Sequence, residues 1–82
     1  MILVEVSVPS INGQYDFRLD ENAYIADIIT EMGNIIFNTD VVDNTKLVEN
    51  LVLCDYSTER MFSMGMTLRD YDIHSGARLT LI

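Results

Sequence analysis

Few residues in this chain have the type and spacing that chemistry requires. His74 is the single histidine, and it lies between Asp72 and Ser75, where it could act as a base for the serine or as a metal ligand beside the carboxylate. A lone histidine with neither cysteine nor paired carboxylates nearby makes a poor site of either kind. The simpler interpretation is a solvated turn residue.

Cys54 is the only cysteine, so it can form no internal disulfide. A nucleophilic cysteine needs a thiolate and therefore positively charged neighbours, but the next residue is Asp55. Cys54 instead follows an apolar run, where a buried thiol behaves as a small hydrophobe. The sequence predicts a core cysteine and a reducing compartment.

Carboxylates are scattered through the predicted loops. A calcium site requires oxygen ligands at regular spacing around a glycine turn, and that spacing is missing. No glycine-rich loop cradles a phosphate either. A solvated acidic surface is the simplest interpretation, and docking to a basic partner is the alternative. The loop carboxylates are Asp40, Asp43, Asp55, Glu59, Asp70 and Asp72. We therefore expect no enzyme, no cofactor and no metal.

Length and charge narrow the class of protein. The 82 residues are 49% hydrophobic, which predicts one folded domain over residues 1–82. The net charge of −8 repels nucleic acid and anionic membranes. The first residues lack a basic leader, and no apolar run approaches the ~20 residues that span a bilayer. We expect a cytoplasmic protein.

Two strands and a helix are predicted in the first half. Residues 2–8 alternate in hydropathy and so do residues 14–19, with Asn12-Gly13 between them as a hairpin signal. Isoleucine and methionine then recur at a helical period from Ile25 to Ile36, after Asp20 or Asn22 as the cap. Gly33 lies inside this helix and could loosen or shorten its last turn.

The second half predicts short elements. A polar connection over residues 38–46 leads to a strand that begins near Leu51, a turn at 57–60 and a short extended segment over 60–64. Thr67 and Asp70 form a capping-box pair that starts one helical turn, and an alternating strand closes the chain after Gly76. The predicted fold class is α+β, a four- to five-stranded sheet with one helix packed across it.

The predicted core combines the inward residues of these elements. Met61, Phe62, Met64 and Met66 could form an adaptable interface, but core packing is the simpler interpretation. The core prediction comprises Val4, Val6, Tyr15, Phe17, Ile25, Ile28, Ile29, Met32, Leu68, Ile73, Leu79 and Leu81.

The element order, with "TLRDYDIHSGARLTLI" at residues 67–82, resembles the β-grasp fold of ubiquitin. The segments "NGQYDFRL" and "SGARLTLI" make the chain most similar to the YukD/EsaB family, small ubiquitin-like proteins associated with type VII secretion systems of Gram-positive bacteria. This resemblance implies an accessory or regulatory protein of secretion. It also implies that the Tyr71 hydroxyl bonds a backbone group of the neighbouring loop.

The resemblance leaves two alternatives open. A ubiquitin-like modifier or sulfur carrier needs a flexible Gly-Gly tail, whereas this sequence ends on Ile82, which favours protein binding without conjugation. Lys46 is the only lysine, so the chain has few of the lysines through which ubiquitin-like modifiers are usually linked into polymers. The other alternative is a ubiquitin-like domain excised from a membrane component of the secretion system.

Strand parity predicts the binding surface. If Val52 and Cys54 point toward the helix, Leu53 points away from it, and Thr80 and Ile82 share that outer face. Ubiquitin-like folds use this face for docking, which gives a candidate protein-binding set of Leu53, Thr80 and Ile82 with Arg60 as a rim charge. The exposed sheet edge and apolar face also allow a weak homodimer.

Overall fold

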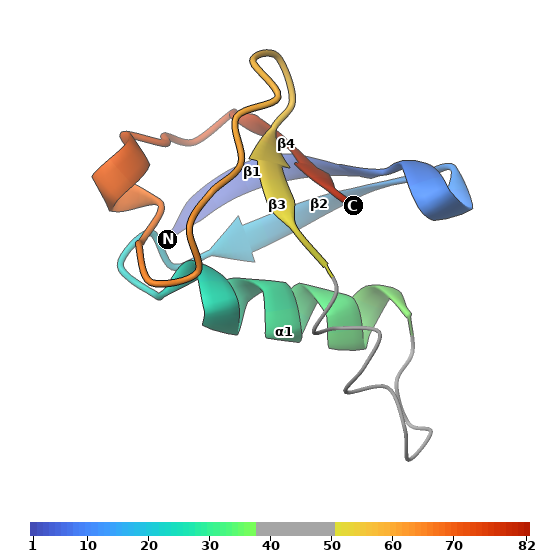
Figure 1. Ribbon diagram of the computed structural model, residues 1–82, viewed down its shortest axis with the longest axis horizontal. Helices are drawn as coiled ribbons and strands as arrows, with labels where there is room; N and C mark the ends of the chain where they lie inside the picture. Colours follow the sequence, from blue (N-terminus) through green and yellow to red (C-terminus); the bar gives the residue numbers. More distant parts are fainter. Residues whose placement is uncertain (38–50) are drawn as a thin grey trace.

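The first two strands form the predicted antiparallel hairpin. In the computed structural model, which describes residues 1–37 and 51–82, β1 (Ile2–Val8) pairs with β2 (Gly13–Leu19) along its whole length (Figure 1). The connection is longer than a two-residue turn, because Pro9–Ile11 form a 3-10 helix, η1, and Asn12 follows at φ 51°. Asn12 therefore provides the left-handed residue of the turn.

One helix follows the hairpin. α1 (Ile25–Ile36) buries one stripe of side chains, among them Ile25, Ile28, Ile29 and Met32, in agreement with the predicted period. Gly33 is buried inside the helix, which nevertheless continues to Ile36. Of the two effects considered for Gly33, a loose last turn or an early end, the early end does not occur.

The start of α1 differs from the prediction of a side-chain cap. Residue 24 precedes the helix without a side-chain cap, and Asp20 Oδ1 instead accepts the N–H of Asn22. The N–H groups of Ile25 and Ala26, at the start of the helix, donate to the carbonyl oxygens of Met66 and Met64, at 2.8 and 3.2 Å. A distant segment of the chain therefore satisfies the donors that a side chain usually satisfies.

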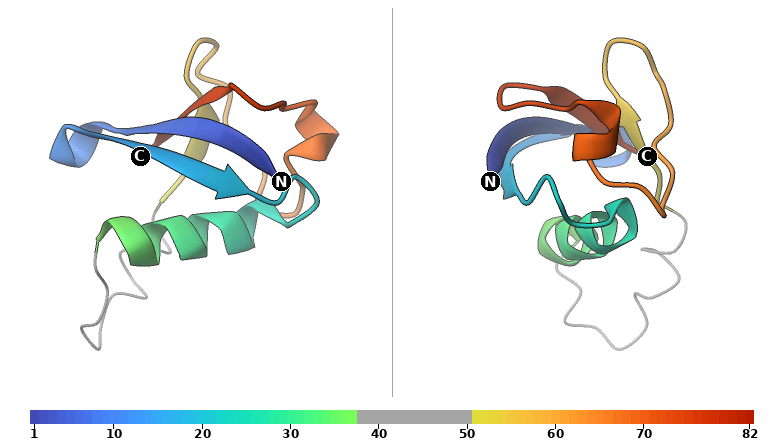
Figure 2. Two further views of the ribbon diagram at one scale, coloured as in Figure 1. Left: turned by 180° about the vertical axis from the view of Figure 1, so that it is seen from behind. Right: turned by 90° about the vertical axis from the view of Figure 1, so that its left-hand side faces the viewer.

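The sheet is mixed and four-stranded. β3 (Leu53–Asp55) and β4 (Arg78–Leu81) complete the order β2-β1-β4-β3, in which β1 and β4 are parallel and the other pairs antiparallel. α1 crosses one face of this sheet (Figures 1 and 2). The extended segment predicted over residues 60–64 contributes only an isolated bridge between Met61 and Cys54. The predicted α+β arrangement is confirmed.

The segment between β3 and β4 contains the predicted capping box. Thr67 N–H donates to Asp70 Oδ2 at 2.9 Å, and Asp70 N–H donates to Thr67 Oγ1 at 3.1 Å. A short 3-10 helix, η2 (Arg69–Tyr71), follows. The Tyr71 hydroxyl accepts the N–H of Ser63 at 2.8 Å, so the role implied for this tyrosine is confirmed.

The core lies between α1 and the inner face of the sheet. Nine of the twelve predicted core residues are buried, while Tyr15, Phe17 and Ile73 pack against the core at its margin. Of the methionine-rich run, only Phe62 is buried, and the core interpretation of the three methionines is wrong. The structure adds Val8, Leu19, Leu51, Leu53 and Phe62 to the predicted core.

Leu53 is the main correction. Its side chain is 0% exposed, whereas parity predicts it on the outer face. Leu53 pairs with Leu81 across β3 and β4, and directly paired residues project to the same face. Because Leu81 is buried in the core, Leu53 is buried with it, and the predicted orientation of β3 is inverted by one residue.

Candidate docking surface on the sheet

The sheet places a row of small and apolar side chains on the face opposite α1. The strand registers align Ser7 of β1 with Thr80 of β4, Thr80 with Cys54 of β3, and Cys54 with Met61. Val6 and Leu79, the neighbours of Ser7 and Thr80, are buried on the α1 side, so this row lies on the opposite face. We call these four residues the outer row.

The outer row lies in an open depression of about 760 Å³. Ile82 at the end of the chain and Tyr56 after β3 also border it. The full lining comprises Ser7, Pro9, Cys54, Asp55, Tyr56, Ser57, Glu59, Met61, Thr80 and Ile82. Because the depression is open, it can receive a protruding side chain of a partner, whereas a buried small molecule would need an enclosed pocket.

Three large apolar side chains around the depression face solvent. Ile82 is 54% exposed, Met61 63% and Tyr56 45%, whereas Cys54 between them is only 5% exposed. Thr80 is half-buried. Exposed apolar side chains that share one concave surface are typical of protein docking sites, while single ones are ordinary.

The structure brings together two residues of the predicted binding set and separates the others. Thr80 and Ile82 both line the depression, but Leu53 lies in the core. Arg60 is exposed and stacks over the ring of Tyr71, 4.8 Å from its centroid, and it does not line the depression.

Sequence reasoning missed Cys54 and Tyr56 as outer-face residues, and it favoured core packing over an interface for Met61. The apolar run over residues 51–54 has no alternation, and hence no period that would fix its orientation. The pairing of β3 with β4 is the feature that orients β3, because the residue that pairs with Thr80 must project to the same face as Thr80.

Charges around the depression are mixed but mainly negative. Asp55 and Glu59 belong to its lining, and the Asp55 carboxylate accepts the Thr58 hydroxyl at 2.8 Å. Arg78 lies over the Tyr56 ring, 4.3 Å from its centroid, and its Nε is 3.5 Å from the Glu5 carboxylate. Arg78 is therefore already paired, and the carboxylates of Asp55 and Glu59 make the charge of the depression negative.

The Cys54 thiol has no activating neighbourhood. Burial raises the pKa of Cys54, and the nearby charge of Glu59 raises this pKa further. A raised pKa keeps the thiol protonated at neutral pH, which disfavours nucleophilic or metal-binding chemistry. Cys54 therefore contributes a small apolar surface to the depression.

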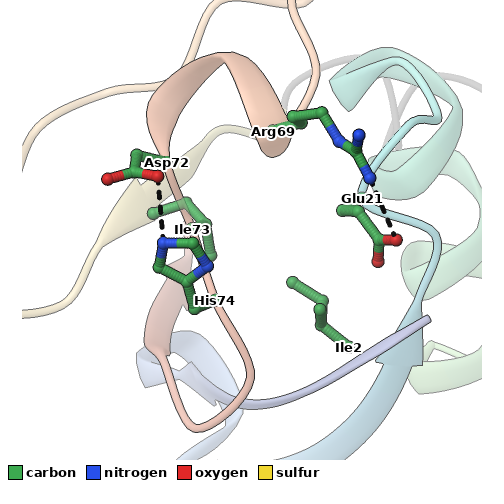
Figure 3. Close-up of a pocket in the computed structure, with 6 residues that line it drawn as sticks. All are labelled: Ile2, Glu21, Arg69, Asp72, Ile73 and His74. Carbon is green, nitrogen blue, oxygen red and sulfur yellow. Dashed lines mark ion pairs between the residues drawn. The ribbon is translucent and has the colours of Figure 1, made fainter.

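His74 and Asp72 form an exposed pair elsewhere on the molecule. His74 Nε2 lies 2.9 Å from Asp72 Oδ1, beside a second hollow near Ile2 (Figure 3). The neighbouring Ser75 hydroxyl accepts the N–H of Leu3 at 3.0 Å, so it is not aimed at the histidine as a nucleophile would be. The pair therefore lacks the third group that a catalytic arrangement needs.

The carboxylates considered as ligands are dispersed. Asp55 bonds Thr58, Asp70 caps η2 and Asp72 pairs with His74, while Asp40 and Asp43 lie outside the described residues. Over residues 1–37 and 51–82, no three His, Cys, Asp or Glu side chains come together as metal ligands would. In the same residues, no helix is long and apolar enough to cross a membrane.

Comparison with known proteins finds matches among solved structures only. No family model matches the chain, and no curated protein matches it. Among solved structures, the solution structure of the N-terminal ubiquitin-like domain in the 4931431F19Rik protein matches with a TM-score of 0.75. The two are 18% identical, and the match covers 99% of this chain and 72% of the other.

This likeness establishes the fold. In all, 295 solved chains match, and a fold so widely shared does not determine what a protein does. The four-stranded mixed sheet, the single helix across it and the structural match agree with one another. The chain has the ubiquitin-like β-grasp fold.

Proposed function

We propose that this protein is a non-enzymatic adaptor that binds another protein through the outer face of its sheet. The observation that supports this proposal is the exposure of Ile82, Met61 and Tyr56 around one depression. Large apolar side chains that surround a concave site are typical anchors of protein interfaces. The proposed binding set is Thr80, Ile82, Cys54, Met61 and Tyr56, with Leu53 and Arg60 removed from it.

The charge of the molecule specifies the partner further. Asp55 and Glu59 line the depression, and the whole chain has a net charge of −8. A partner with an apolar anchor between lysine or arginine side chains would gain both apolar burial and faster association. The same charge disfavours nucleic acid as the partner.

The proposed setting is type VII secretion. The segments "NGQYDFRL" and "SGARLTLI" resemble the YukD/EsaB family, which makes an accessory or regulatory protein of that cytoplasmic machinery the favoured role. A single unpaired cysteine fits a reducing compartment. The competing roles are a modifier or sulfur carrier and a domain of a membrane component. Adduct formation with an activating enzyme would support the modifier or carrier, and gene context would distinguish the membrane-component domain.

Mutation of the depression tests the proposal. Ile82→Asp and Met61→Asp place a charge among the anchors, and each should weaken binding to the cytosolic domains of neighbouring secretion components about tenfold or more. Ile35→Asp is the matched control, because Ile35 is exposed on α1, across the sheet from the depression. Titration calorimetry with folding checked by circular dichroism measures both.

The result that would contradict the proposal is equally specific. If both depression variants fold and bind as tightly as the unmodified chain, the outer face is not the binding surface. If Ile35→Asp alone abolishes binding, the interface lies on the helix.

A further inference from the structure

The strand β2 forms a free border of the sheet. Its only strand neighbour among the described residues is β1, and β3 lies at the opposite border (Figure 2). An edge strand presents unpaired backbone N–H and C=O groups, which are a template for pairing with another strand.

The hydrogen bonds of β1 show which groups of β2 point outward. Glu5 N–H donates to the Ala77 carbonyl, and the Leu3 carbonyl accepts from Gly76 N–H. The backbone N–H and C=O groups of the odd-numbered residues of β1 therefore point toward β4. The backbone groups of the even-numbered residues of β1 therefore point toward β2, where they form hydrogen bonds with the odd-numbered residues of β2. It follows that the backbone groups of Gln14, Asp16 and Arg18 point away from the sheet.

The two charges on this edge are poorly accommodated in one chain. Asp16 lies directly opposite Glu5, and like charges in that position are destabilising. Glu5 is compensated by Arg78 on its other side, at 3.5 Å, but Asp16 has no ion pair among the described residues.

Arg18 also lacks a partner. Arg69 pairs with Glu21, Arg78 pairs with Glu5, and Arg60 stacks on an aromatic ring. In the described part of the chain, Arg18 is the one arginine with neither an ion pair nor a ring contact. The uncompensated acid and the uncompensated base are thus two residues apart on the same free edge.

We propose that β2 pairs with β2 of a second copy of this chain, antiparallel, about a two-fold axis at Phe17. This register places Asp16 opposite Arg18 of the other copy, and Arg18 opposite its Asp16, so both uncompensated charges gain partners. The outward backbone groups of the two residues exchange hydrogen bonds. Phe17 faces its own counterpart, and Tyr15 faces Leu19.

Neighbouring registers are less favourable. An axis at Asp16 sets Asp16 against its own copy, and an axis at Tyr15 sets Asp16 against Gln14 and leaves Arg18 unpaired. Charge complementarity therefore favours the register about Phe17 over these two neighbours.

The pairing adds to the proposed adaptor function without using its surface. β2 and β3 lie at opposite borders, so the depression beside β3 remains open in each copy. The dimer would present two docking surfaces, and a partner with two matching sites would bind it with avidity.

Charge exchange across the edge tests this register. Self-association should be weak, with a dissociation constant on the order of 0.1–1 mM, and sedimentation over that range measures it. Asp16→Arg should weaken it about tenfold or more, because both cross-copy pairs become Arg–Arg. Asp16→Arg with Arg18→Asp restores opposite charges and should return association to within about threefold of the original.

The controls separate this register from general electrostatics and from the outer face. Asp16→Arg reduces the net negative charge, so repulsion between whole molecules alone would predict tighter association, the opposite sign. Glu31→Arg makes the same charge change on α1 and should not weaken association. Ile82→Asp should leave it unchanged.

Several results would overturn the edge dimer. The first is a monomer mass at all protein concentrations. The second is that folded Asp16→Arg self-associates as tightly as the unmodified chain or more tightly. The third is that Asp16→Arg with Arg18→Asp fails to restore self-association, or that Ile82→Asp abolishes it. Partner binding by the depression is measured at concentrations where the edge dimer is dissociated, so the two proposals are tested separately.

Discussion

Leu53 and Ile82 show how one residue of strand register decides between core and surface. Both are apolar, and Leu53 begins β3 while Ile82 directly follows β4, yet Leu53 is fully buried and Ile82 is 54% exposed. The difference follows from pairing, because Leu53 lies opposite inward-facing Leu81, while Ile82 is one position beyond Leu81 and its side chain projects to the other face. The proposed docking surface depends on this orientation.

Alanine substitution at these two positions tests the orientation directly. Leu53→Ala removes buried methyl groups and should lower the free energy of unfolding by about 2–5 kcal/mol. Ile82→Ala removes exposed ones and should cost less than about 1 kcal/mol. Urea denaturation of both variants measures the contrast. Equal costs, or a larger cost at Ile82, would show that the orientation of β3 and β4 is reversed.

At the scale of elements, the sequence predicts well where local signals are strong. The hairpin after Pro9, the amphipathic α1 and the Thr67–Asp70 capping box all have short-range patterns, and each is present. β3 could be located but not oriented, because its residues follow an apolar run without alternation.

The start of α1 could not be predicted from sequence for a different reason. Met64 and Met66 supply backbone carbonyls to the helix, and any residue type can do so. Such a cap leaves no trace in local composition. The docking surface is likewise a property of strand pairing, so only Thr80 and Ile82 of its residues could be predicted.

The capping box provides the prediction at this scale. Thr67→Ala removes the hydroxyl that accepts the Asp70 N–H, and it should lower the free energy of unfolding by about 1 kcal/mol. Asn22→Ala is the control, because the backbone N–H of Asn22, and not its side chain, makes the bond to Asp20. Urea denaturation measures both variants. A larger loss of unfolding free energy for Asn22→Ala than for Thr67→Ala would mean that α1 starts on a side-chain cap after all.

At the scale of the whole molecule, Glu21 joins distant parts of the chain. Its carboxylate lies 3.6 Å from the Arg69 guanidinium (Figure 3). The same carboxylate lies 3.3 Å from the Met1 ammonium, and the Glu21 carbonyl accepts the Arg69 N–H. The beginning of β1, the β2–α1 connection and η2 therefore meet at one residue.

This junction makes stability depend on pH. The backbone N–H of Glu21 and the Met1 ammonium hold the pKa of the Glu21 carboxyl below its usual value, with a smaller effect from Arg69. A carboxyl whose pKa is lower in the folded state stabilises the fold above its unfolded pKa, and this contribution is lost as the pH falls through the folded pKa.

Glu21→Gln should therefore reduce stability at neutral pH, and the difference from the unmodified protein should shrink as the pH falls below about 4. Thermal unfolding at several pH values measures this. Glu31→Gln, on the exposed face of α1, should show no such convergence. A difference at Glu21 that stays constant from neutral to acid pH would mean that packing, and not charge, is responsible.

Amide chemical-shift mapping tests the docking surface most directly. A ¹⁵N-labelled sample is titrated with the cytosolic domain of a secretion component that binds it, at a protein concentration below that of self-association. We expect the largest shifts on the outer row, Ile82 and Tyr56, while the outward amides of β2 remain unchanged. Largest shifts on α1 or on β2, with the outer row unmoved, would contradict it.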